Sequence, residues 1–149
     1  MQLSTKTRYA IRALVELALH DNKEPYMLKE IARRQDISNK YLEQLMSPLR
    51  AQNLVYTVRG NRGGYLLSRP PEEITIFDIL QALEGSLAPA PCLDKRNICN
   101  RIDICAIRDM WSELHQTIAE KLKNTTLAEL AEKQRSKQIH NNNTADYMI

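Results

Sequence analysis

Apolar residues near the start of the chain recur three or four positions apart. Ala10, Ala13 and Leu17 illustrate this spacing, which places them on one face of a helix between Ser4 and His20. A hydroxyl side chain at the start of the segment can cap the helix, because its oxygen accepts hydrogen bonds from the free amides of the first turn. The pattern predicts a first amphipathic helix.

Two shorter helical patterns follow a loop at residues 21–25. Leu28 and Ile31 mark a second helix that stops near Gln35, and Ser38 can cap a third helix. The buried stripe of the third helix comprises Leu42, Leu45, Met46 and Leu49. The pattern therefore predicts two short helices joined by a tight turn.

The segment after the third helix is rich in β-branched and aromatic residues, which favour strands. Pro48 lacks an amide hydrogen and is expected to kink or end the third helix shortly before this segment. Residues 54–58 and 65–67 form two strand-like segments, and residues 59–64 between them are dense in glycine. These features predict a β-hairpin with a basic tip.

The second half of the chain contains further helical patterns. Thr75 and Asp78 form a capping-box-like start for a helix that ends at Gly85, and a longer helix runs from Ala106 to about Lys123. One apolar seam follows the longer helix through Ile107, Trp111, Leu114, Ile118 and Leu122. A small domain cannot easily wrap such a helix alone. We therefore expect a second copy of the chain to cover the seam, although packing on the first helix would also satisfy it.

A last helix is expected to start at Thr126 with Glu129, and a polar tail follows it. The 149 residues contain 43% hydrophobic residues, enough for one ordinary domain or a small domain with an appended dimerisation element. Their longest apolar runs fall far short of the ~20 residues that cross a bilayer, and the first residues do not resemble a secretory signal. We expect a globular protein of the cytoplasm.

The two halves of the chain differ in charge. Residues 1–70 carry 12 Lys and Arg against 6 Asp and Glu, a net charge of +6. Residues 71–149 carry 9 against 12, a net charge of −3. A basic half suggests contact with a polyanion, although a solvated basic face explains such an excess equally well.

The order of helix, short helix, tight turn, helix and β-hairpin is typical of a winged helix-turn-helix. In this module the second helix of the pair enters the major groove of double-stranded DNA, and the hairpin reaches the adjacent backbone or minor groove. The candidate DNA-binding residues are Ser38, Asn39, Lys40, Glu43 and Gln44 on the third predicted helix and Arg59 and Arg62 in the hairpin. Alternatively, Ser38 is only a cap, Glu43 only a solvated charge and the hairpin an ordinary turn. Taken together with the charge, the features favour DNA binding.

All three cysteines of the chain lie close together, as Cys92, Cys99 and Cys105. Such an odd number of thiols in a reducing compartment argues against a disulfide framework. Three thiolates could hold an iron–sulfur cluster or a zinc ion, since both prefer sulfur. A zinc ribbon needs more closely spaced pairs, so zinc is the weaker fit, and free buried thiols are the alternative without a ligand.

Residues 3–19, 31–70 and 74–85 resemble a family of bacterial winged-helix regulators. This family is typified by the iron–sulfur cluster regulator IscR, the nitric-oxide sensor NsrR and the cysteine-metabolism regulator CymR. The motif YLEQL joined to the hairpin RGxxGGYxL carries the likeness, which extends over roughly residues 1–135. The resemblance implies a homodimer that binds a pseudo-palindromic operator. Asn53 stands where many relatives have glycine, a departure in the turn that leads into the hairpin.

The resemblance also implies roles for particular residues. DNA contacts fall on Ser38, Lys40, Glu43 and Gln44, and the minor-groove contact falls on Arg59. Cluster-bearing members hold a 2Fe–2S or 4Fe–4S cluster on three cysteines that match Cys92, Cys99 and Cys105, whereas members like CymR lack these cysteines. The fourth ligand does not carry over, because Arg108 replaces a histidine ligand and Arg8 replaces an acidic one. The remaining candidates are Asp94, Asp103, Asp109, an exogenous thiol and water.

We therefore expect a mainly α protein with a small β-hairpin wing. Its predicted parts are a winged helix-turn-helix DNA-binding domain (1–85), a cysteine cluster-binding loop (86–105), dimerisation and C-terminal helices (106–137) and a polar tail (138–149). The expected function is a transcription regulator that senses iron–sulfur cluster status, redox state or nitric oxide. The alternatives are a cluster-free regulator of cysteine or sulfur metabolism that responds to a metabolite or partner protein, and a small redox enzyme or electron carrier. An enzyme is disfavoured, because the sequence shows neither a nucleotide loop nor a catalytic His, Ser and Asp grouping.

Overall fold

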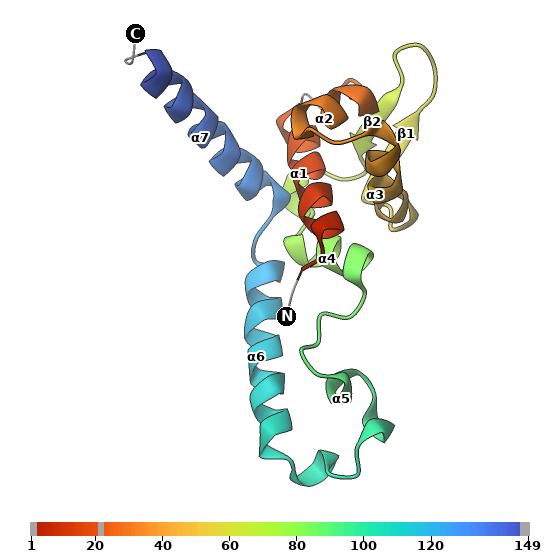
Figure 1. The fold of residues 1–149 in the computed structure, drawn as a ribbon, viewed down its shortest axis with the longest axis vertical. Coiled ribbons are helices and arrows are strands. Elements are labelled where there is room, and N and C mark those ends of the chain that lie inside the picture. The colour runs from red at the N-terminus through yellow and green to blue at the C-terminus, as the bar shows by residue number, and fades with distance from the viewer. Residues whose placement is uncertain (1–2, 21–22, 147–149) are drawn as a thin grey trace.

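The computed structural model describes residues 3–20 and 23–146, and it is mostly helical with one antiparallel hairpin (Figure 1). The α-helices are α1 (Thr5–Leu19), α2 (Leu28–Gln35), α3 (Asn39–Ala51), α4 (Ile76–Glu84), α5 (Pro91–Asp94), α6 (Ala106–Lys123) and α7 (Leu127–Asp146). The strands are β1 (Val55–Val58) and β2 (Gly64–Leu67), and the short 3-10 helices are η1 (Pro71–Glu73), η2 (Arg96–Ile98) and η3 (Ile102–Ile104). This order confirms the predicted fold class. Within the described ranges, no helix combines the length and apolar content that a bilayer crossing requires.

Helix α1 closely matches its predicted bounds. Ser4 occupies the N-cap, where its Oγ accepts a hydrogen bond from the Thr7 amide at 3.2 Å. The buried apolar residues of this helix are Ala10, Ala13, Leu14 and Leu17. Each fully buried leucine contributes about 1.5–3 kcal/mol relative to an exposed one, so the apolar face fixes the helix on the core.

Helices α2 and α3 form the predicted helix-turn-helix. Asp36 ends α2 in the left-handed region with φ of 53°, and the Ser38 Oγ accepts a hydrogen bond from the Tyr41 amide at 3.1 Å at the start of α3. Helix α3 continues through Pro48 to Ala51, so the proline does not end it at once. The helix nevertheless stops within one turn, as expected where a proline removes an amide donor.

A left-handed residue leads from α3 into the hairpin. Asn53 has φ of 54°, a region that asparagine enters more readily than most residues. The chain therefore makes this turn without the glycine that many resembling proteins carry at the position. Strand β1 then pairs with β2, with Val55 opposite Leu67 and Val58 opposite Gly64.

The hairpin is anchored to the segment that precedes α2. The Tyr26 amide donates to the Tyr65 carbonyl at 3.0 Å, and the Tyr65 amide donates to the Tyr26 carbonyl at 2.9 Å. A Cβ atom on Gly64 would collide with the backbone of Tyr26, so this close approach requires glycine. The two-stranded hairpin thus has a third backbone partner, which limits its freedom to swing.

One apolar core joins α1 to α4, the hairpin and the start of α7. Its largest fully buried side chains include Leu14, Ile31, Leu42, Leu49, Leu54, Ile79 and Leu127. Helix α7 contributes through its first turns only, and its main partner is α1. The core therefore belongs to the winged-helix portion of the chain.

A short backbone pairing connects this portion to α6 and α7. The Ile76 amide donates to the Thr125 carbonyl at 2.9 Å, and the Leu127 amide donates to the Ile74 carbonyl at 2.8 Å. Thr75, between these partners, forms a capping box with Asp78 that starts α4, as the sequence predicts. The end of α6 is thereby fixed at the start of α4.

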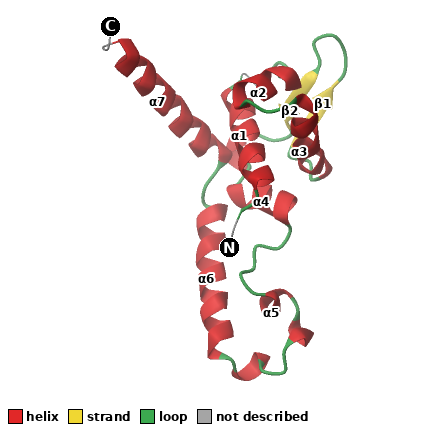
Figure 2. Ribbon diagram, in the orientation of Figure 1, coloured by secondary structure: helices red, strands yellow, loops and turns green. Residues whose placement is uncertain are grey.

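Helix α6 and the cysteine loop form an arm that extends away from the core (Figures 1 and 2). The principal contacts of α6 are with α4 and α5, and none of its residues is buried. The predicted alternative, in which α6 packs along α1, is not the arrangement observed. The apolar seam of α6 is instead open, with Ile107 65% exposed and Leu114 42% exposed.

Helix α7 runs beyond the point where the sequence analysis places a polar tail. It includes residues 138–146, which lie in the predicted tail. Residues 127–146 contain no glycine or proline, so nothing in their backbone chemistry interrupts the helix. The side chains of residues 138–142 are polar or exposed to solvent, but their backbone is helical.

Candidate nucleic-acid interface and cysteine loop

The start of α3 presents polar side chains to solvent. Ser38, Asn39, Lys40, Glu43 and Gln44 are all exposed. Lys40, Glu43 and Gln44 lie three or four residues apart and so share one face of the helix, opposite the buried leucines. The Oγ of Ser38 caps the helix, as the alternative without DNA contact expects. Its second lone pair stays available for another donor, so the cap does not exclude a DNA contact. The predicted recognition residues are therefore displayed together.

Arg59 and Arg62 lie at the tip of the hairpin, and both are exposed. Gly60 between them has φ of 121°, and the Gly63 amide donates to the Gly60 carbonyl at 2.9 Å, which closes the turn. A Cβ atom on Gly63 would collide with the Val58 carbonyl. The glycines thus form a tight tip from which two arginines extend.

The base of the hairpin lies near helix α3. Burial raises the pKa of Tyr65 on β2, while the nearby Arg50 charge lowers it and the Glu43 charge raises it. Both charged residues belong to α3, and α3 also contacts β1, so the recognition helix and the hairpin lie close to each other. This geometry is what a winged helix needs to read two adjacent grooves.

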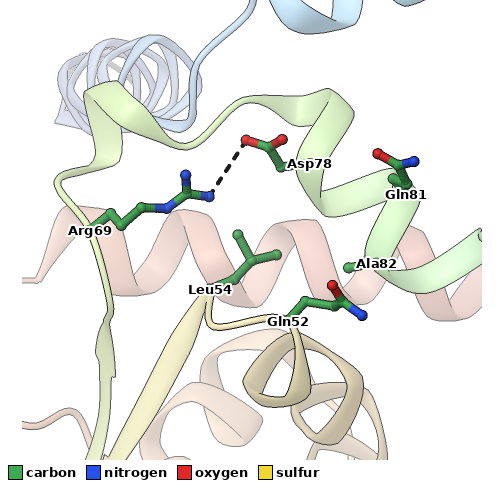
Figure 3. Close-up of a pocket in the computed structure, with 6 residues that line it drawn as sticks. All are labelled: Gln52, Leu54, Arg69, Asp78, Gln81 and Ala82. Carbon is green, nitrogen blue, oxygen red and sulfur yellow. Dashed lines mark ion pairs between the residues drawn. The ribbon is translucent and has the colours of Figure 1, made fainter.

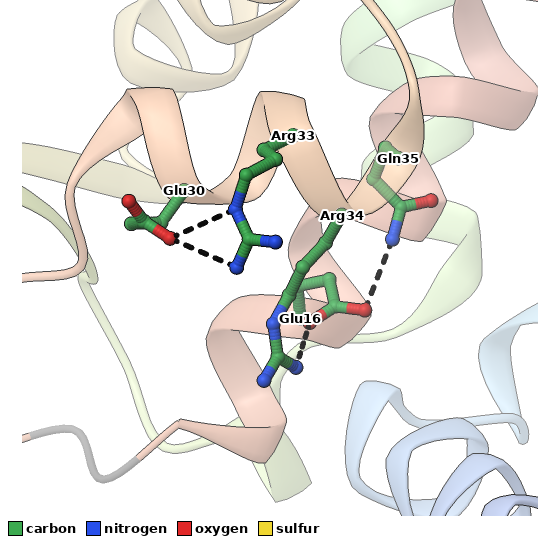
Figure 4. A network of polar contacts seen from close by, with 5 residues as sticks. All are labelled: Glu16, Glu30, Arg33, Arg34 and Gln35. Carbon is green, nitrogen blue, oxygen red and sulfur yellow. Dashed lines mark hydrogen bonds and ion pairs between the residues drawn. The ribbon is translucent and has the colours of Figure 1, made fainter.

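A buried carboxylate, which the sequence analysis does not predict, holds α1 against α2 (Figure 4). Glu16 is only 7% exposed, and its two oxygens accept hydrogen bonds from Arg34 and Gln35, each at 3.0 Å. The hydrogen bond to Glu16 is the main cause that raises the pKa of Arg34. The signal was available, because Glu16 lies three residues after Ala13 on the apolar face of α1. A charge at such a position requires partners.

A surface cavity of about 430 Å³ lies between the end of α3, the hairpin and α4 (Figure 3). Arg69 and Asp78 face each other across it with an N···O distance of 3.6 Å. Asp78 also caps α4, and Leu54 beneath it belongs to the core. This ion pair connects the loop after β2 to α4, and we assign the cavity a structural role.

The three cysteines are spread along the loop between α4 and α6. Cys92 lies in α5 and is partly buried, Cys99 follows η2 and is exposed, and Cys105 is the partly buried N-cap residue of α6. All three thiols are free. Asp94, a candidate fourth ligand, accepts a hydrogen bond from the Ser86 hydroxyl at 2.5 Å.

The cysteine loop has the donors of a metal site but an open arrangement. Three thiols in one loop are chemically suited to an iron–sulfur cluster. In the described part of the chain, however, no three His, Cys, Asp or Glu side chains are gathered closely enough to hold a metal ion. The donor set therefore fits such a group, whereas this conformation does not bring the three thiols together. Binding would require the loop to close.

Comparison with known proteins gives consistent results. The model of the Rrf2 family, described as an iron-dependent transcriptional regulator, matches residues 3–133. The HTH-type transcriptional regulator IscR of Sodalis glossinidius is 44% identical over 130 residues, which are 87% of this chain and 78% of that protein.

Two solved structures have the same fold. The structure of CymR, the global cysteine regulator of B. subtilis, has a TM-score of 0.76 and 38% identity, covering 89% of this chain and 98% of that chain. T. potens IscR has a TM-score of 0.75 and 37% identity, covering 93% of this chain and 91% of that chain.

A helix-turn-helix packed on the core, an exposed polar face on α3 and a basic hairpin define a winged-helix regulator that binds DNA. The chain belongs to the Rrf2 family of transcription regulators. Its relatives are regulators, not enzymes. The family resemblance noted in the sequence is thus confirmed.

Proposed function

We propose that this Rrf2-family protein is a cytoplasmic homodimer that binds a pseudo-palindromic operator and senses an iron–sulfur cluster held by Cys92, Cys99 and Cys105. The observation that carries the proposal is that the exposed recognition helix and the arm with its three free thiols are both attached to the same core. The physiological signal would be cluster supply, redox state or nitric oxide.

The DNA-binding part of the proposal is supported by α3 and the wing. Asn39 and Lys40 can reach phosphates, while Glu43 and Gln44 have the chemistry to read a cytosine amino group and an adenine edge. Arg59 and Arg62 can enter a narrow minor groove, whose negative potential attracts guanidinium groups. The Glu16 network supports this surface from behind by fixing α2 on α1.

The homodimer is supported by the open seam of α6. On α6, Ile107, Met110 and Leu114 are 65%, 50% and 42% exposed, and Ile104 at the end of η3 just before it is 80% exposed. Trp111, Ile118 and Leu122 of the same seam are partly buried. Exposed apolar side chains gathered at the start of α6 are unfavourable in water, and a second copy of the same helix is a self-complementary cover. A dimer also places two recognition helices on the two halves of a palindromic operator.

The sensing part of the proposal rests on the thiols and on the way the arm is attached. A bound cluster would supply an iron centre that reacts with oxidants and nitric oxide. The protein itself must close the loop around that centre. The loop joins α4 at Gly85, and α6 returns to α4 through the pairing of residues 74–76 with 125–127. Loop closure would therefore act directly on α4, whose buried residues Ile76, Ile79 and Leu80 belong to the core. A tenfold change in DNA affinity requires a coupling of only about 1.4 kcal/mol.

Anaerobic reconstitution with iron and sulfide tests the proposal. We expect visible absorbance, bound iron and sulfide by native mass spectrometry, and a changed affinity in a gel shift at fixed salt. Cys99→Ala should lose the absorbance while keeping the far-UV circular dichroism of the fold, because Cys99 is exposed and contributes nothing to the core. A Cys99→Ala protein that retains the full chromophore would contradict ligation by Cys99.

A second candidate is a cluster-free regulator of cysteine or sulfur metabolism that responds to a metabolite or partner protein. It is favoured by the open arrangement of the three thiols and by the structural likeness to CymR. The same experiment separates the two. Identical DNA affinity before and after reconstitution supports the second candidate.

A further inference from the structure

Arg108 connects two of the three cysteines in the arm. It lies in the first turn of α6, where its backbone amide donates to the Cys105 carbonyl at 3.1 Å. Its side chain extends to α5, where Nε donates to the Cys92 carbonyl at 3.4 Å. Helix α5 packs against α6, so this hydrogen bond links two elements that are distant in the loop sequence.

The environment of Arg108 differs from that of the other loop arginines. Arg96 and Arg101 are exposed, whereas Arg108 is partly buried. Within the described residues, no carboxylate lies within ion-pair distance of Arg108, although Arg69 nearer the core has such a partner at 3.6 Å. A guanidinium carries five N–H donors and keeps its charge at all ordinary pH values, so the Cys92 contact uses only part of its capacity.

We propose that Arg108 is a positioning residue that holds Cys92 over the first turn of α6 and so keeps the Cys92 and Cys105 thiols at one end of the arm. Its cation then lies beside the site where thiolate charge collects when the loop closes. This inference deepens the proposed function, because it assigns Arg108 a role in the same cysteine site. The Arg108–Cys92 hydrogen bond itself exists without any cluster, which allows a separate test.

Proximity of the two thiols can be measured in the full-length apo protein. A Cys99→Ser background leaves Cys92 and Cys105 as the only thiols of the chain. A bifunctional bromobimane reports their proximity, because cross-linking requires the two reactive groups of one reagent molecule to reach both thiols. Arg108→Met removes the donor and the charge but keeps an aliphatic stem of similar length, and it should lower the cross-linking yield about threefold, as expected for one lost hydrogen bond.

Two further variants show whether the donor is responsible. Arg108→Lys keeps a cationic donor and should recover at least half of the lost yield. Arg101→Ala removes an arginine of the same loop that is exposed and should leave the yield unchanged. A monofunctional bromobimane should react equally with all variants, which separates proximity from thiol reactivity. Far-UV circular dichroism should be unchanged in all of them.

The inference is overturned if Arg108→Met cross-links as efficiently as its Cys99→Ser parent. It is also overturned if Arg108→Lys and Arg108→Met lose the same amount. Failure of the proposed function gives a different result, because the wild-type chain would then bind no iron or sulfide while the cross-linking differences persisted. If the chain binds a cluster, Arg108→Met should lose its visible absorbance faster than Arg101→Ala on dilution under anoxic conditions.

Discussion

The winged-helix portion and the arm use the same hydrophobic periodicity with opposite results. In α1 and α3 the apolar positions are buried against one another, and Leu14 and Leu42 have no exposed surface. In α6 the apolar positions recur just as regularly over 18 residues, yet none is buried. The apolar faces of α1 and α3 are covered by other parts of the same chain, whereas the apolar face of α6 is not fully covered.

This contrast indicates which parts of the molecule are complete on their own. The winged helix has a closed core and a hairpin whose strand β2 is anchored to Tyr26, so one chain suffices to define it. The arm exposes Ile107 and Leu114, and its three thiols are not gathered into a metal site within the described residues. Under the proposed function, a second chain covers the seam and a bound group draws the thiols together. An amphipathic pattern predicts a helix with a covered face, but it does not say which chain provides the cover.

The largest effect on stability should come from a substitution in the core of the winged-helix portion. Leu14→Ala removes a fully buried side chain from α1 and should lower the free energy of unfolding by about 2.7–5 kcal/mol. Ile107→Ala, on the arm, should change the stability of the monomer by less than about 1 kcal/mol, because its side chain is 65% exposed. Urea unfolding at low protein concentration measures both. Equal losses for the two variants would contradict the contrast.

The next largest effect should come from disrupting the proposed dimer interface on α6. Leu114→Glu places a charge on the apolar seam of α6 and should convert a dimer into a monomer, measured by light scattering after gel filtration. Operator affinity should fall about a hundredfold, because the second half-site loses the effective concentration that the dimer provides. Glu113→Gln, exposed and one residue away, is the control and should remain dimeric. A Leu114→Glu protein that remains a dimer would place the interface elsewhere.

Much of the fold follows from local chemistry that the sequence displays. Ser4 and Ser38 cap the helices they precede, Thr75 and Asp78 form a capping box, and α6 begins at Ala106 and ends at Lys123 as predicted. These features depend on contacts within a few residues, which is why they can be predicted from the chain alone.

The features that sequence analysis does not reveal depend on distant contacts. The pairing of Tyr26 with Tyr65 and the Glu16 contacts to Arg34 and Gln35 join segments whose relative placement is set only after folding. The same holds for Arg108, whose contact with Cys92 joins two segments of the arm that are sixteen residues apart. The DNA-binding and cysteine residues themselves stay predictions, supported by their exposure and position.

A smaller effect, on DNA affinity, should show that the winged-helix portion contacts DNA and the arm does not. Arg59→Ala removes an exposed guanidinium from the wing and should weaken operator binding by about 1–3 kcal/mol, with a relaxed preference for narrow minor grooves. Arg101→Ala, an arginine of the arm, should leave binding at fixed salt nearly unchanged. Fluorescence anisotropy with operators of different minor-groove width measures both. Equal losses would mean that the arm also contacts DNA.

The smallest effect concerns the boundary between the portions. Glu84, the last residue of α4, lies directly before Gly85 and the cysteine loop. Its Oε1 accepts hydrogen bonds from the Ser4 amide at 3.0 Å, from the Ser4 hydroxyl at 2.6 Å and from the Thr7 hydroxyl. These hydrogen bonds, first the one from the Ser4 hydroxyl, then those from the Thr7 hydroxyl and the Ser4 amide, hold the pKa of Glu84 below its ordinary value of 4.5. The boundary is thus tied to the start of α1 through one carboxylate.

The lowered pKa fixes the sign of a pH dependence. The contribution of ionised Glu84 to folding is fully present above its ordinary pKa of 4.5 and is lost as the pH falls through the lower folded value. Because the side chain is accessible to water, we expect less than about 1 kcal/mol. Glu84→Gln should lower the Tm at pH 7 and reduce its decline below pH 4.5, whereas Glu72→Gln, exposed on η1, should match the wild type. If Glu84→Gln and wild type show parallel declines in Tm, the carboxylate does not secure this boundary, and the arm is held to the core by the pairing of residues 74–76 with 125–127 and by the packing of α6 on α4.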